Sequence, residues 1–272
     1  MIIPRNKILF ILSSFLLFTL YGCTSTLTKE KPATGCQILW KPNSENLRFK
    51  GSSASSIIMA LAPDDSPSLK RNVFKGPNDI AQIKLTLFDR NITAARITFD
   101  IFLEDGFEFS RGGHKLPLGL WGGSLDSRCL AGGCPPTRQD GFSIRLIENQ
   151  GLLGLYIYNL NRSSGSDKKV YGSTHISSTY IESNRWHKIA IDVFLNSPNR
   201  NDGMSYLWLN DKLVLIVRDL IFRNADDWFI RGPLLTELWG GDIYLWGSQS
   251  PKDQSIWFKN YRINKLNCHE DL

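Results

Sequence analysis

The sequence predicts an all-β chain folded as a single jelly roll or concanavalin-like sandwich. Many short apolar runs are separated by turn residues, and no window has a long helical period. Apolar side chains occupy every second position from 83 to 87 and from 97 to 101, as in strands with one buried face. The 272 residues are enough for one large sandwich, and they contain no internal repeat and no linker that would divide it.

The expected strands follow one another along most of the chain. They are Leu47–Gly51, Ser56–Leu61, Gln82–Phe88, Ala95–Leu103, Phe142–Ile147, Leu152–Leu160, His187–Leu195, Met204–Leu209, Leu213–Arg218 and Ser255–Ile263. Asn210 and Asp211 suit the tight turn of a hairpin between two of these runs. Residues Asp226–Ile230 allow a helical turn.

Residues 1–22 are predicted to form a signal peptide. Arg5 and Lys7 precede an apolar run that ends at Leu20, which is too short to favour a membrane-spanning helix. The segment ending in Cys23 resembles a bacterial lipobox, in which the cysteine is lipidated. Residues 23–35 would form a tether and residues 36–268 the folded domain. We therefore expect an exported protein with a lipid anchor in a bacterial membrane, periplasmic or at the cell surface; a secretory signal and an uncleaved anchor are the alternatives.

The cysteines agree with export. Five cysteines are an odd number, and lipidation of Cys23 leaves four that can pair. Of three connectivities we expect Cys129–Cys134, which would close a small loop, and Cys36–Cys268, since the ends of a compact domain often lie close together. A zinc site is the alternative, but the chain has no C-x-x-C pair. We expect neither a metal nor another cofactor.

The charge balance favours an anionic partner. The formal charge is +6, and it is +4 without the two basic residues of the leader. The sequence has no basic stripe and no nucleic-acid-binding motif, so we expect no nucleic acid as partner. We expect a monomer.

A cluster of polar side chains is expected around two strand-like runs that follow a glycine-rich loop carrying Lys115. Alternation places Ser143 and Arg145 on one face of the first run, and Tyr156 and Tyr158 on one face of the second. If the two runs pair, all five side chains converge on one concave surface. Such a set suits an anionic substrate, because Arg145 can bind a carboxylate while Lys115 or a tyrosine moves a proton. The alternative is a solvated lysine and arginine beside packing aromatics.

Four sequence blocks resemble polysaccharide lyase family 14, which includes alginate lyases. EDGFEFSRGGHKLPLGLWGG resembles the glycine-rich block of that family, and DGFSIRL and LGLYIYNL resemble its following strands. LTELWGG, with SQSPKDQSIWFKNYRI after it, resembles the closing block. The resemblance extends over residues 95–265, and the blocks occur in the same order.

The resemblance implies a β-jelly roll that cleaves a uronic-acid polymer, alginate or glucuronan, by β-elimination. It assigns catalytic roles to Lys115, Arg145, Tyr156 and Tyr158, and sugar binding to Ser143. Lysine and tyrosine both have reference pKa values near 10, so either must be shifted to act as a base near neutrality. Of these residues we favour a tyrosine, Tyr158 before Tyr156, as the acid–base group.

Two further residues are candidates for substrate binding. Trp121 can stack on a sugar face, and His114 lies directly before the lysine. His114 and Leu118 are additional to the family block, so we expect them to lengthen the loop that carries Lys115.

Two other functions remain open. A glycoside hydrolase would use paired carboxylates, for which Asp100, Glu104, Asp105 and Glu108 are near the site in sequence. A non-catalytic carbohydrate-binding lipoprotein on the same scaffold would retain Arg145 and the aromatics. A lyase creates a conjugated double bond that absorbs in the ultraviolet, a hydrolase releases reducing ends without it, and a binding protein does neither.

Overall fold

The computed structural model describes residues 37–42, 57–76, 80–88, 91–109, 113–124, 126–127, 140–161, 171–239 and 250–266. The expected signal peptide, the tether, all five cysteines and the expected strand Leu47–Gly51 lie outside these residues. The described residues belong to one compact unit that runs from Ala33 to Leu272. They contain strands and no helix, so none of them forms a helix that could cross a membrane.

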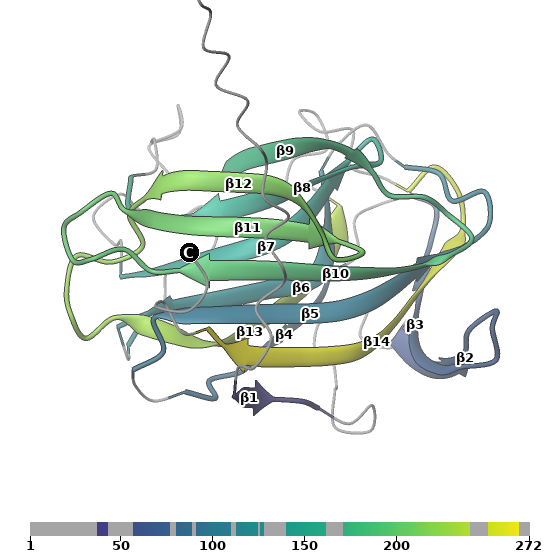
Figure 1. Ribbon diagram of the computed structural model, residues 1–272. Coiled ribbons are helices and arrows are strands. Elements are labelled where there is room, and N and C mark those ends of the chain that lie inside the picture. Colours follow the sequence, from purple (N-terminus) through teal and green to yellow (C-terminus); the bar gives the residue numbers. More distant parts are fainter. Residues whose placement is uncertain are drawn as a thin grey trace, which may run out of the picture. The chain divides into compact units, whose positions relative to one another are not determined.

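Two antiparallel sheets face each other (Figure 1). The larger sheet has the order β12-β11-β10-β5-β14-β3-β2, with β1 also paired to β14. Its strands are β1 (Ile38–Trp40), β2 (Ile57–Leu61), β3 (Pro67–Val73), β5 (Ala94–Leu103), β10 (Trp186–Phe194), β11 (Gly203–Leu209), β12 (Lys212–Leu220) and β14 (Gln254–Lys265). The predicted all-β sandwich is therefore confirmed.

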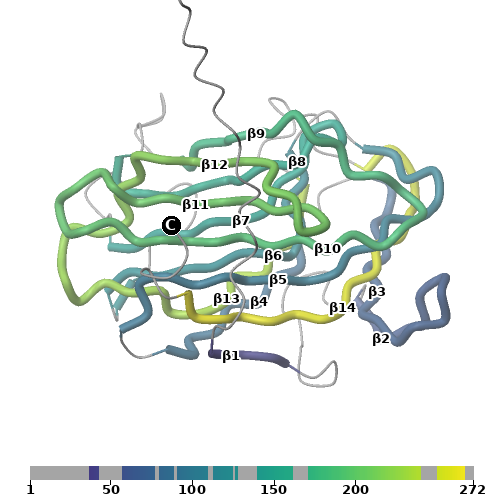
Figure 2. Tube along the Cα trace, viewed as in Figure 1, coloured from purple at the N-terminus to yellow at the C-terminus, as the bar shows by residue number. Residues whose placement is uncertain are grey.

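The smaller sheet has six strands in the order β4-β13-β6-β7-β8-β9. These are β4 (Ala81–Lys84), β6 (His114–Gly123), β7 (Gly141–Asn149), β8 (Leu152–Tyr158), β9 (Ser173–Tyr180) and β13 (Phe229–Trp239). The last of the described strands, β14, returns to lie beside β5 in the middle of the larger sheet, as the colours of Figure 2 show.

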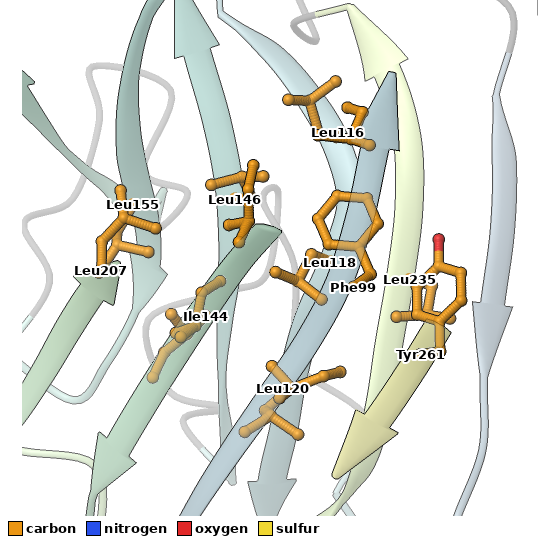
Figure 3. Packing of buried hydrophobic residues seen from close by; sticks show 14 of the residues in the cluster. Phe99, Leu116, Leu118, Leu120, Ile144, Leu146, Leu155, Leu207, Leu235 and Tyr261 are labelled. Carbon is orange, nitrogen blue, oxygen red and sulfur yellow. The ribbon is translucent and has the colours of Figure 1, made fainter. Parts of the chain in front are cut away.

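The core lies between the sheets and is built from alternate residues of their strands. Phe99 of β5 packs with Leu116, Leu118 and Leu120 of β6 and with Ile144 of β7 in one fully buried cluster (Figure 3). Because side chains alternate along a strand, the residues between these leucines point to the opposite face of the smaller sheet. That outer face is where the candidate site residues lie.

Several of the expected strands appear within a few residues of their predicted bounds. The hairpin turn is also confirmed, since Asn210 and Asp211 have φ values of 50° and 62°. The helical turn at Asp226–Ile230 was wrong, because Phe229 and Ile230 begin β13.

The segment that carries Lys115 is not a loop. His114–Gly123 forms β6, a central strand hydrogen-bonded to β13 on one side and β7 on the other. A Cβ at Gly119 would lie 2.5 Å from the carbonyl oxygen of Ile144 and 2.7 Å from that of Leu234. Glycine is needed here because the neighbouring backbones approach closely, so it marks a central strand rather than a turn.

The pairing of β6 with β7 contains a bulge. Lys115 pairs with Ile147 and Gly119 pairs with Arg145, so four steps along β6 match two along β7. An even number of extra residues leaves the alternation of faces unchanged, and Lys115 and Gly119 stay on the outer face.

Candidate active site on the smaller sheet

Five of the predicted site residues form one cluster on the outer face of the smaller sheet. Lys115 comes from β6, Ser143 and Arg145 from β7, and Tyr156 and Tyr158 from β8. In the ladder between β7 and β8, Arg145 pairs with Tyr156 and Ser143 with Tyr158, so these four residues form two adjacent cross-strand pairs. The structure thus brings together the residues that the sequence placed on one surface.

Two cations flank two phenols in this cluster. The hydroxyl of Tyr158 donates to that of Tyr156 at 3.3 Å, and the two rings meet edge to face with centroids 5.1 Å apart. Lys115 Nζ lies 4.6 Å from the centre of the Tyr156 ring, and Arg145 Cζ lies 5.5 Å from that of Tyr158. Both contacts are within the range of cation–π attraction, so each cation is held against one tyrosine.

Burial sets the electrostatics of the cluster. Lys115 is 7% exposed, and its pKa falls to about 8, mainly through burial and secondly through the positive charge of Arg145. Burial also lowers the pKa of Arg145, an effect that Tyr158 and Tyr156 oppose. Among the described residues Lys115 forms no ion pair. A substrate carboxylate can therefore supply a counter-charge that the lysine lacks in this part of the chain.

Replacing Lys115 with methionine is expected to stabilise the fold at pH 7. The lysine binds its proton less tightly in the folded chain than in the unfolded chain, so its burial costs free energy below pH 8, and this cost declines as the pH rises towards 10.5. A pKa difference of this size corresponds to about 3 kcal/mol, and loss of the contact with Tyr156 offsets about 1 kcal/mol. Urea unfolding should show Lys115→Met more stable by about 2 kcal/mol at pH 7, with a smaller difference at pH 10.

The matched control for this measurement is Lys188→Met, because Lys188 is exposed and paired with Asp211. It should gain no stability at either pH. A Lys115→Met protein that is less stable than the parent at pH 7 would show that burial of the lysine carries no cost.

Trp121 shares the outer face but is covered. It is 3% exposed, its Nε1 donates to the carbonyl of Leu85 at 2.8 Å, and Lys84 Nζ lies 3.9 Å from its ring centre. Lys84 is a third cation on this face that the sequence analysis missed. The sequence did indicate its position, because Lys84 lies between the apolar residues Ile83 and Leu85 and must face away from the core if they face into it.

His114 is on the other side of the sheet. Its ring is fully buried between the sheets, stacks on Trp239 at 3.9 Å, and has Nε2 2.6 Å from Glu237 Oε1. Its Nδ1 faces Glu148 Oε1 at 3.6 Å, and burial raises the pKa of Glu148 to about 8. Arg71 Nε donates to the second oxygen of Glu237 at 2.5 Å. The expectation that His114 faces the substrate is corrected. His114 is two residues before Leu116 in β6, so its side chain points into the core with the leucines.

Two of the four carboxylates considered for hydrolysis, Asp100 and Glu104, are engaged elsewhere. Glu104 Oε2 accepts from the backbone N–H of Ser255 at 2.5 Å, and Asp100 Oδ2 accepts from Asn260 at 2.6 Å; both acids belong to or directly follow β5 of the larger sheet. Among the described residues, no group of His, Cys, Asp and Glu side chains is arranged to hold a metal ion. Around Lys115 the described part of the outer face offers two cations, two phenols and the hydroxyl of Ser143, while a carboxylate, Asp140, faces Lys84.

Comparison with known proteins gives one family and several solved structures with a similar fold. The family model for polysaccharide lyase 14 matches residues 52–261. Among solved structures, an alginate lyase from Aplysia kurodai is 22% identical, with 85% of this chain and 100% of that chain covered and a TM-score of 0.69. An alginate lyase from a Chlorella virus is 18% identical (85% and 100% covered, TM-score 0.62), and an endo-β-1,4-glucuronan lyase from Trichoderma reesei is 11% identical (87% and 94% covered, TM-score 0.54). No curated protein sequence matches. At these identities the structural likeness shows a shared fold.

Proposed function

The chain belongs to polysaccharide lyase family 14, and from this premise we propose that it cleaves a uronic-acid polymer by β-elimination at the outer face of the smaller sheet. The observation that carries the proposal is the contact set there, in which Lys115 lies against Tyr156 and Arg145 against Tyr158 while the two hydroxyls meet at 3.3 Å. Positive charge beside proton-transfer groups is what elimination next to a carboxylate requires.

The first task of the site is to neutralise a carboxylate. The C5 proton of a uronate is a poor acid as long as the adjacent carboxylate keeps its full negative charge. Arg145 presents a planar guanidinium fork that can bind both carboxylate oxygens, and the low exposure of the site strengthens the attraction. Lys115 adds a second positive charge, which stabilises the enolate that forms when the proton leaves.

The second task is to move two protons. In the elimination the C5–H and C4–O bonds break, a C4=C5 double bond forms, and the leaving oxygen takes up a proton. We assign both transfers to the tyrosine pair. Tyr158 in its phenolate form takes the C5 proton and then gives a proton to the leaving oxygen, which returns Tyr158 to the phenolate, with Tyr156 as its hydrogen-bonded partner. Protons are conserved, since the one taken from C5 balances the one given to oxygen.

The polymer has a path across the strands. Lys84 pairs with Leu234. The register of β13 with β6 is the same at every printed pair from Gly232 to Trp239, so Leu234 is level with Gly119, which pairs with Arg145. Three strand spacings therefore separate the backbones of Lys84 and Arg145, about 14 Å. Positions this far apart let Lys84 and Arg145 face different uronate units of one polymer, and we assign the sugar contact beside Tyr158 to the Ser143 hydroxyl.

The test is incubation of the purified chain with polymers of different uronates. We would use mannuronate-rich alginate, guluronate-rich alginate and glucuronan, since the structural relatives include alginate and glucuronan lyases. Growth of ultraviolet absorbance together with new chain ends supports elimination. New reducing ends without absorbance would indicate a hydrolase, and retention on the polymer without cleavage would indicate a binding protein.

We propose, from the sequence alone, that Cys23 carries a lipid anchor and that Cys129–Cys134 and Cys36–Cys268 are disulfides. In cells fed a labelled fatty acid, Cys23→Ser should abolish incorporation of the label and release the protein from the membrane fraction. Label retained by Cys23→Ser would rule out lipidation at this residue. Peptide mapping without reduction tests the two disulfides.

A further inference from the structure

The bulge in β6 lies directly beside Lys115. Three residues, Leu116 to Leu118, span the bulge, while β7 has the single residue Leu146 opposite them. Pro117, at the centre of the bulge, has no backbone N–H, so no donor is left unpaired there. The carbonyl of Pro117 is buried and still needs a hydrogen-bond donor. Lys115 directly precedes this short stretch, and Gly119, which directly follows it, pairs with Arg145.

Tyr261 supplies that partner from the opposite sheet. Its hydroxyl donates to the carbonyl of Pro117 at 3.1 Å across the core, and its ring stacks on Phe99 with centroids 5.4 Å apart, where Figure 3 shows the two together. Burial raises the pKa of Tyr261 well above its usual value, so the hydroxyl keeps its proton and remains a donor.

A second bulge turns Tyr261 inward. Lys259 pairs with Asp100 and Arg262 with Thr98, so β14 has one extra residue relative to β5 at this point. Asn260 sits in it with a φ of 60°. Because one extra residue reverses the alternation, Tyr261 faces the core where an unbroken strand would turn it outward. Two strand irregularities, one in each sheet, thus meet through a single hydrogen bond.

We propose that Tyr261 is a positioning residue for the lyase reaction, which fixes the β6 bulge and thereby the place of Lys115 beside Arg145 and Tyr156. The inference rests on the proposed function of Lys115. A positioning role explains why the buried side chain of Tyr261 keeps a hydroxyl. It also explains why that hydroxyl donates to the carbonyl of Pro117, a residue that has no paired partner in β7. On the other side of Lys115, the contact of His114 with Glu237 holds the strand in the same way.

The experiment compares Tyr261→Phe with the parent in the full chain. Phenylalanine keeps the ring and its stacking but leaves the Pro117 carbonyl without its donor. Titration of the Lys115 side chain by lysine-ε-carbon NMR, assigned with Lys115→Arg, reports its surroundings without any need for turnover. We expect its midpoint to move from about 8 towards 10.5 by about one pH unit, as the amine becomes more hydrated. We expect kcat on the best uronan to fall about tenfold to a hundredfold with little change in KM.

The matched control is Ser205→Ala. Ser205 Oγ is a buried donor to a strand carbonyl, that of Asp192 at 2.8 Å, and lies in the larger sheet. It should keep the parental midpoint and kcat. If Tyr261→Phe does not fold, Pro117→Gly loosens the same bulge from the β6 side and should give the same shift. An unchanged Lys115 midpoint in a folded variant overturns the proposal, as does an equal shift in Ser205→Ala. A parent without lyase activity would refute the proposed function, while the titration still tests the positioning.

Discussion

Arg145→Lys is expected to lower kcat/KM on the best uronan by a hundredfold to a thousandfold. A lysine keeps the charge but replaces a planar fork by a single point, so it cannot hold both oxygens of a carboxylate. Loss of one group that stabilises developing charge in a buried site costs about 3–4 kcal/mol, which corresponds to this range. The measurement is the steady-state rate of ultraviolet absorbance increase, with folding checked by circular dichroism.

The control for this variant is Arg96→Lys. Arg96 also lies over an aromatic ring, with Cζ 5.0 Å from the centre of Trp208, and it pairs with Asp192 on the larger sheet. It should keep the parental rate. A folded Arg145→Lys or Arg145→Ala protein with a near-normal rate would refute the role of Arg145 in binding the carboxylate.

Tyr158→Phe is expected to lower kcat by a hundredfold to ten-thousandfold. The change removes the hydroxyl that is proposed to exchange protons with the sugar and keeps the ring beside Arg145. Tyr156→Phe should cost less, because its hydroxyl accepts from Tyr158 and acts through it. Combined with Arg145→Lys, the loss should be smaller than the product of the single losses, since the residues act on one sugar unit.

Tyr206→Phe is the matched control, because Tyr206 is a buried tyrosine of the larger sheet. Equal losses in Tyr156→Phe and Tyr158→Phe would assign the proton transfer to the pair rather than to Tyr158. A near-normal rate in both would exclude the tyrosines as the acid–base groups.

Much of the fold follows from the period of two in the sequence. Strand β5 is recognisable in the sequence because Ile97, Phe99 and Ile101 alternate with more polar residues. In the structure these three side chains pack into the core. Strand β6 was missed because Gly119 and Pro117 are loop signals in most contexts. The alternating leucines at 116, 118 and 120 carried the correct signal, but it was outweighed by the glycines on either side of them.

The same misreading explains the one site residue placed on the wrong face. Once β6 is a strand, His114 has the parity of Leu116 and must point into the core, while Lys115 must point outward. Arg145 and the tyrosines were predictable because β7 and β8 are regular and pair without a shift. The contact of Tyr261 with Pro117 could not be predicted, because it joins residues from different sheets. The β6 bulge leaves the alternation unchanged, and the phase change in β14 turns Tyr261 inward without indicating which residue it meets.

The β6 bulge contains two extra residues relative to β7, and this even number has a consequence for the gene. One codon added or removed between Lys115 and Gly119 would reverse the faces on one side of the change, so that either the lysine or the core leucines would point the wrong way. Two codons preserve the faces and slide the lysine along the strand by up to about 7 Å relative to Arg145. In this stretch, the length changes that a working enzyme tolerates should therefore come in steps of six nucleotides, and each step would alter the reach between the two cations.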